Sequence, residues 1–355
     1  MNFTKNINLS TNEISLTTVF WEPVGSGCRL LRCFGNSPIL NVPDKIDEKE
    51  VTEIGPYCFS RSRPIFPERT YKTIFIDANN QETSSEEGQS LNQKDVDFSS
   101  FGTELDGTFL EEVTLPDSVT TLHNAAFYNC RKLKKLSVGT QISGIGSDEF
   151  MNDSKLEHLI IRGKDSEVTG LSLILERIAE NITVSFCPDS SLSPESTLFF
   201  PEYYEWLDEI SPAHIFSRSI HGEGFRMRRS FENGILDYRK YDSCFENALT
   251  IESSESLCKI ALNRLLWPSR LGNDFKEKYE TTIKEHIDTA FALAINEQDF
   301  SLLQFICEHF SPDSQVLSAA IDLCIEKEWS EGNAFLIEAK HKIFSKKTFD
   351  FDLNF

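Results

Sequence analysis

Apolar residues recur at a fixed step in the first half of the chain. Leu110, Leu133 and Leu156 lie 23 residues apart, and each opens a short segment in which apolar and polar residues alternate. Alternation over so short a run predicts a strand with one buried face. A step of roughly 20–29 residues marks a solenoid, in which each unit buries its apolar face against its neighbours. The pattern therefore predicts a stack of short parallel strands.

The rest of each unit repeats in the same register. A turn follows each strand, then a second apolar pair, then a phenylalanine that we expect to be buried, Phe127 in one unit and Phe150 in the next. Val51–Phe59 matches Val119–Phe127 and predicts an earlier copy, with Tyr71–Ile76 as its following strand. Upstream, Ile39–Val42 is interpreted as part of a hairpin that caps the stack.

The repeats share a specific sequence motif. Val119-Thr-x-Leu122, then Ala126-Phe127, Cys130 and Leu133, resembles the BspA-like bacterial leucine-rich repeats, and Val51-Thr-x-Ile54-Gly up to Phe59 does so too. The resemblance covers residues of about 25–190. It implies a leucine-rich-repeat solenoid that binds proteins of varied kinds, commonly at the cell surface or after secretion. The first ten residues, which begin with Met1, depart from that habit because they show no signal-peptide pattern.

The second half of the chain changes to a helical period. Apolar residues of Leu257–Leu266 recur at the spacing of one helix face. Further helices are predicted over residues 275–295, 300–310, 316–328 and 331–344, and matching positions 30 residues apart, such as Ile306 and Leu336, suggest stacked helical hairpins. The fold class predicted is α+β, with a leucine-rich-repeat β-solenoid followed by an all-α helical-hairpin domain.

These patterns divide the chain into successive segments. Residues 77–109 carry eight acids and one lysine and are interpreted as an acidic loop inserted into the repeats. The predicted segments are an N-terminal cap at 1–50, repeats at 51–190, a proline- and aromatic-rich linker with a basic junction at 191–244, a helical array at 245–345 and a tail at 346–355.

Charge and composition narrow the range of functions that the sequence allows. The net charge of −21 argues against nucleic acid as the partner, because phosphate binding needs clustered Lys and Arg. No apolar run is long enough to cross a membrane. The nine cysteines are scattered without a C-x-x-C pair, which favours neither a disulfide framework nor a zinc site. No metal, cofactor or catalytic residue is predicted, and a cytoplasmic location is expected, or an extracellular one if a signal peptide has been removed.

Two surfaces are candidates for binding. Strand alternation turns every second residue outward, and on the concave face these residues form the predicted partner site: Thr73, Phe75, Glu112, Thr114, Lys135, Ser137, His158 and Ile160. In the basic segment 213–240, Arg226, Arg228 and Arg229 could contact an anion or an acidic partner. Alternatively these arginines pair with acids and join the domains. A metal site from His214, His221 and Glu223, or a catalytic site within 200–245, are further alternatives.

The leading hypothesis is a non-catalytic interaction or scaffold protein, monomeric alone, that holds a protein partner of unknown identity with both solenoids. A surface-exposed or secreted ligand-binding protein is the second reading, and an enzyme with its site in residues 200–245 is the third.

Overall fold

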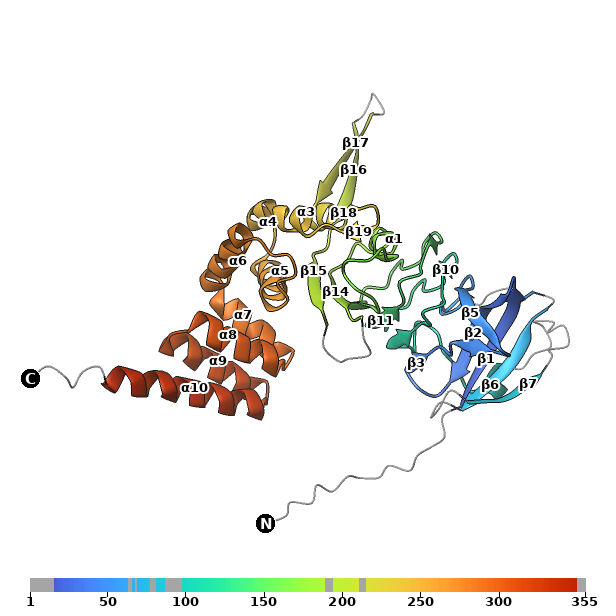
Figure 1. The fold of residues 1–355 in the computed structure, drawn as a ribbon, viewed down its shortest axis with the longest axis horizontal. Coiled ribbons are helices and arrows are strands. Elements are labelled where there is room, and N and C mark those ends of the chain that lie inside the picture. Colours follow the sequence, from blue (N-terminus) through green and yellow to red (C-terminus); the bar gives the residue numbers. More distant parts are fainter. Residues whose placement is uncertain are drawn as a thin grey trace, which may run out of the picture. The chain divides into compact units, whose positions relative to one another are not determined.

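A computed structural model describes residues 16–62, 66–67, 69–76, 81–86, 98–188, 194–210 and 215–349 (Figure 1). The chain divides into two compact units. The first ends at residue 193 and takes in residues 233–235, and the second holds the remainder. Strands dominate the first unit and helices the second, which confirms the α+β class predicted from the sequence.

A parallel ladder forms the spine of the first unit, in the strand order β14-β13-β11-β9-β3. Val113 lies opposite Leu136, and Leu136 lies opposite Leu159, so the 23-residue register is confirmed. The ladder belongs to a β-solenoid of about five turns. The strands of the ladder are β3 (Ile39–Asn41), β9 (Glu112–Thr114), β11 (Lys135–Val138), β13 (His158–Ile161) and β14 (Ile182–Phe186).

A second sheet contains the other strand of each repeat. Three of its strands pair in parallel, β5 (Lys49–Ile54), β10 (Thr121–Leu122) and β12 (Gly144–Ile145). β2 pairs in parallel with β5, and beyond it the sheet continues with antiparallel pairs in the order β2-β1-β6-β7. Its strands are β1 (Leu16–Val24), β2 (Gly27–Gly35), β6 (Tyr71–Ile76) and β7 (Gln81–Glu86), with β4 (Lys45–Ile46) on β5 and β8 (Thr103–Glu104) on β2. The short helix α1 (Leu171–Leu175) follows the last full repeat.

Two predictions about the first repeats are wrong. Tyr71–Ile76 is not a ladder strand, because it pairs antiparallel with β1 and β7 in the second sheet. The place beside β9 belongs to β3, where Leu40 lies opposite Val113, so Ile39–Asn41 is a repeat strand and not a capping hairpin. Alternation shows that a segment is a strand with a buried face, but it does not identify the sheet that the strand joins.

The described residues of the acidic segment 77–109 form regular elements. It contains β7, a turn of 3₁₀ helix over Phe98–Phe101, and β8. The buried guanidinium of Arg32 pairs with Glu104 at 2.7 Å, and Leu105 is buried in the core. The predicted loop is therefore wrong for these residues, because a partner 72 residues away stabilises the Glu104 carboxylate.

The repeats share a core of stacked phenylalanines and a repeated backbone. The Phe127 ring lies 5.0 Å from that of Phe59 and 5.6 Å from that of Phe150. Left-handed backbone recurs 23 residues apart, at Asn129 and Asn152, where asparagine tolerates a positive φ better than most residues. Three turns of the solenoid thus stack one phenylalanine ring on the next, and the last two of these turns share the same left-handed position.

The second unit is mainly helical among its described residues. Its helices stack in pairs, with α7 between α5 and α9, and α10 against α8 and α9. The helices are α2 (Gly224–Met227), α3 (Tyr238–Ser243), α4 (Phe245–Ile251), α5 (Ser254–Leu266), α6 (Asn273–Glu285), α7 (Ile287–Asn296), α8 (Phe300–Phe310), α9 (Ser314–Glu326) and α10 (Ser330–Phe349). The short strands are β15 (Ser196–Phe200), β16 (Tyr204–Ile210), β17 (Ile215–His221), β18 (Phe231–Glu232) and β19 (Ile235–Leu236).

The predicted helix over residues 275–295 is in fact two. His286 lies between α6 and α7 with φ −118° and ψ 34°, a conformation outside the helical region. Neither Gly nor Pro marks this break, so the sequence gives no signal for it. The last helix, α10, extends to Phe349. It therefore includes residues 346–349 of the segment that was predicted as a tail.

A buried ion pair joins three helices of the second unit. Arg264 on α5 donates from Nε and Nη2 to the two carboxylate oxygens of Asp242 on α3, at 2.8 and 2.9 Å. The Tyr279 hydroxyl on α6 donates to the same carboxylate at 2.7 Å. Bidentate geometry with an added hydrogen bond is what makes a buried pair tolerable.

The phenylalanine stack predicts a large local effect of one substitution. Phe127→Ala removes a fully buried ring from the middle of the stack. We expect the free energy of unfolding to fall by about 3–5 kcal/mol. Hydrogen exchange of the amides in β9–β13 would measure the loss within the first unit. Met151→Ala is the control, because this side chain is 49% exposed and its removal should change exchange little. Equal protection in Phe127→Ala and wild type would contradict the role of the stack.

Candidate functional site

The outward side chains of the parallel ladder form two rows, which together we call the ladder strip. The register places one row at Ile39, Glu112, Lys135, His158 and Thr183, and the other at Asn41, Thr114, Ser137, Ile160 and Ser185. Six of the eight residues predicted for the partner site lie in these rows, in the order predicted.

The first row is partly open to solvent. Ile39 is 51% exposed, and His158 is exposed as well. Lys135 and Glu112 are half-buried and form an ion pair, with Nζ 3.1 Å from Oε2. An aliphatic group, an ion pair and an imidazole therefore lie side by side on neighbouring strands.

Arg162 covers part of the second row. Its guanidinium donates to Ser137 Oγ at 2.7 Å, to Asp117 Oδ1 at 2.9 Å and to the Leu115 carbonyl oxygen. Ser137 is consequently only 7% exposed. The prediction that Ser137 faces solvent is wrong, since a long side chain from a neighbouring repeat lies over it.

Two further predicted residues lie elsewhere. Thr73 and Phe75 belong to β6 of the second sheet, and both are buried, Phe75 with 2% exposure. The Trp21 indole N–H donates to Thr73 Oγ1 at 3.0 Å. Their assignment to the partner site followed from placing β6 in the ladder, and it is wrong for the same reason. Ile39 and Asn41 take those two places. The sequence interpretation missed both of them, as well as Thr183 and Ser185 at the other end of the rows.

The arginines at 226, 228 and 229 do not form one cluster. Arg228 is 2% exposed, donates to the Pro201 carbonyl oxygen and lies over the Tyr203 ring at 5.3 Å. Arg229 lies 3.5 Å from the centre of the Phe225 ring, and Arg226 pairs with Glu223 at 3.2 Å. Three guanidinium groups held by three different partners do not build a common anion site.

Polar side chains in residues 200–245, the range suggested for an enzyme site, have structural contacts. Asp237 caps α3 by accepting a hydrogen bond from the Lys240 amide, and His221 stacks on Tyr204 with ring centres 4.8 Å apart. His214 lies outside the described residues. Within the described ranges no group of three His, Cys, Asp or Glu side chains could hold a metal ion. No helix among those ranges is long and apolar enough to cross a membrane.

Comparison with protein families identifies the repeats. Residues 103–173 match the family model of a BspA type leucine rich repeat region (6 copies). The repeats within residues 103–173 are therefore of the BspA type, as their sequence motif indicated. No curated protein and no solved structure gives a significant match. Leucine-rich-repeat solenoids typically serve as scaffolds for protein interaction, with extended binding surfaces made by stacking repeats.

Two buried carboxyl groups stand where the previous repeat has Ala126 and Cys130. Glu149 accepts a hydrogen bond from the Ala126 amide at 3.2 Å, and Asp153 accepts one from the Cys130 amide at 2.7 Å. Each acid thus binds the backbone of its own counterpart one repeat earlier. Burial raises the pKa of Glu149 and the pKa of Asp153, each to about 8.

These raised pKa values predict a stability that depends on pH. In the unfolded chain both carboxyl groups titrate near pH ~4, so the folded state holds more protons between pH ~4 and about 8. The free energy of unfolding should therefore fall as pH rises from about 5 to about 9. Hydrogen exchange of the amides in β10–β13, corrected for the intrinsic rate at each pH, measures this fall.

The control keeps the shape of the side chains and removes their titration. Glu149→Gln with Asp153→Asn should flatten the dependence of protection on pH. The same slope in this double variant and in wild type would show that other groups cause it.

Proposed function

We propose that this chain recognises a protein partner through the exposed row of the ladder strip. The observation that carries the proposal is the in-register line of Ile39, Glu112, Lys135 and His158 on adjacent strands. Neighbouring strands lie about 4.8 Å apart, so the four side chains span about 14 Å of surface. Their different chemistry offers apolar, ionic and hydrogen-bonding contacts along one line.

Rigidity of the backbone supports this proposal. Every strand in the row is bonded to its neighbours, and the phenylalanine stack fixes the repeats behind it. A partner that docks on such a surface loses little free energy to ordering of the ladder. An exposed isoleucine at the end of the row adds apolar area where a partner could bury it.

Substitution of the row tests the proposal. The bait Glu112→Ala, Lys135→Ala, His158→Ala should lose a partner that wild-type protein enriches from lysate of its source organism. We expect at least a tenfold weaker affinity, about 1.4 kcal/mol, when the purified pair is titrated. The substituted residues are at the surface, so the fold should persist.

A matched triple variant serves as the control. Arg131→Ala, Gln141→Ala, Glu176→Ala removes one base, one uncharged polar side chain and one acid, all exposed in the same unit and none of them in the two rows of the strip. It should retain the partner at wild-type affinity. Retention of the partner by the strip variant, or equal loss in both variants, would exclude the row as the binding site.

A further inference from the structure

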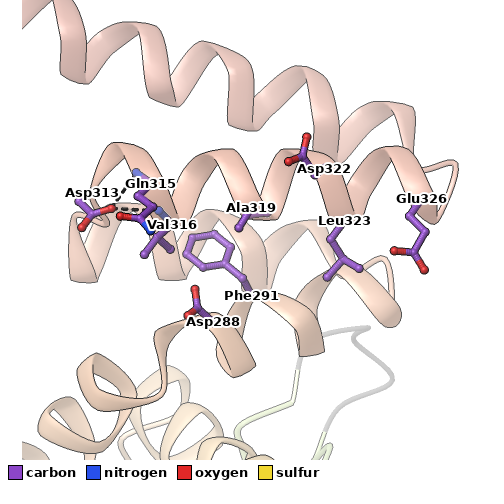
Figure 2. Close-up of a pocket in the computed structure, with 10 residues that line it drawn as sticks. Asp288, Phe291, Asp313, Gln315, Val316, Ala319, Asp322, Leu323 and Glu326 are labelled. Atoms are coloured by element: carbon purple, nitrogen blue, oxygen red, sulfur yellow. Dashed lines mark hydrogen bonds between the residues drawn. The ribbon is translucent and has the colours of Figure 1, made fainter.

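The second unit has a groove of its own, between α7 and α9. Its volume is about 610 Å³. Phe291 on α7 and Val316, Ala319, Ala320 and Leu323 on α9 form an apolar floor. Figure 2 shows Val316, Ala319 and Leu323 in succession along α9, with Asp313 near one end and Glu326 near the other. Ala319 is exposed and Leu323 is half-exposed, so part of this floor is accessible from solvent.

The rim of the groove is acidic. Asp288, Asp313, Asp322 and Glu326 line it, and no Lys or Arg is among the lining residues. Asp313 is engaged, since it caps α9 by accepting hydrogen bonds from the amides of Gln315 and Val316. For the other three carboxylates no ion pair is found among the described residues, which leaves their charge open to a ligand.

Two of the acidic residues place negative charge near the C-terminal end of α9, where the helix dipole disfavours it. Asp322 and Glu326 lie one turn apart, a spacing at which like charges repel. Both lie in the last turns of α9, near the negative end of its dipole, and α9 has no basic residue in its last turn. Lys327 follows at the cap but does not line the groove. A cation bound here would relieve this repulsion.

We propose that the α7–α9 groove binds a basic amphipathic helix of a partner protein. The walls are helices whose backbone groups are already paired, so they offer side chains but no strand edge. An incoming extended peptide would have to leave its own amides unpaired against the apolar floor, whereas a helix satisfies them internally. Aliphatic side chains at i, i+3, i+4 and i+7 would cover the floor, and Lys or Arg beside them would face Asp288, Asp322 and Glu326.

The dimensions fit such a ligand. Helix α9 has 13 residues and is therefore about 20 Å long, at about 1.5 Å per residue. A ligand helix of about 14 residues would match it. This site is separate from the ladder strip, which belongs to the first unit, and it does not depend on the function proposed there.

Fluorescence anisotropy with full-length protein tests the proposal. The probe is a labelled synthetic peptide of about 14 residues with leucines on one helical face and lysines elsewhere. One comparison peptide scrambles the same composition so that no apolar face remains, and another replaces each lysine by glutamate. We expect the first peptide to bind at least tenfold more tightly than either.

Three protein variants locate the site. Asp322→Lys with Glu326→Lys should weaken binding of the probe at least tenfold. Glu308→Lys with Glu331→Lys makes the same change of charge on α8 and α10, outside the groove, and should bind like wild type. Leu323→Gln removes apolar floor without changing charge and should also weaken binding. Circular dichroism and thermal unfolding verify that each variant is folded.

Three results would contradict the proposal, and each has a different explanation. Equal affinity for the scrambled peptide would show attraction to a protein of net charge −21 and no groove-specific site. An equal loss of affinity for the probe in both charge-reversal variants would also overturn the proposal. Self-association that sedimentation detects in wild type but not in the Asp322→Lys, Glu326→Lys variant would assign the groove to a second copy of this chain instead.

Discussion

The 23-residue register is the constraint on which the first unit depends. It brings each side chain onto its counterpart in the next repeat, so that phenylalanine meets phenylalanine and Asn152 donates to Asn129 at 2.9 Å. Polar residues also contact their counterparts at this 23-residue spacing. The Lys134–Glu111 pair joins consecutive repeats at 2.7 Å, 23 residues apart. On β9, β11 and β13 this step decides which side chains of the ladder strip become neighbours.

The sequence predicted the parts of the fold that this register repeats. Val113, Leu136 and Leu159 share apolar character at a constant step, and their ladder positions are as expected. Prediction failed where the pattern is local. Tyr71–Ile76 alternates like a repeat strand but pairs with β1, whereas Ile39–Asn41 has one buried residue and too weak a signal to be assigned to the ladder. Sheet membership depends on hydrogen bonds between distant segments, which alternation does not record.

The candidate site shows the same division. Strand alternation identified Glu112, Lys135 and His158 as outward-facing, because that property depends only on their own strands. It could not foresee that Arg162 would reach over the neighbouring strand and bury Ser137, since a long side chain can cover surface contributed by another repeat. The α7–α9 groove was not foreseen for a related reason. Its floor and rim come from two helices, and the 30-residue period indicated the pairing of helices without showing which faces remain uncovered.

Glu149 and Asp153 have a consequence for how this chain could evolve. Repeat proteins commonly change length by duplicating or deleting whole units, since each unit contacts only its neighbours. Here the repeat that carries Glu149 and Asp153 differs from the repeat before it, which has Ala126 and Cys130 at the positions beneath the two carboxyl groups. A recombination that placed another such repeat on top of it would set buried carboxyl groups against carboxyl groups. Duplication of this repeat would therefore be less favourable than duplication of a repeat with small apolar residues at these two positions.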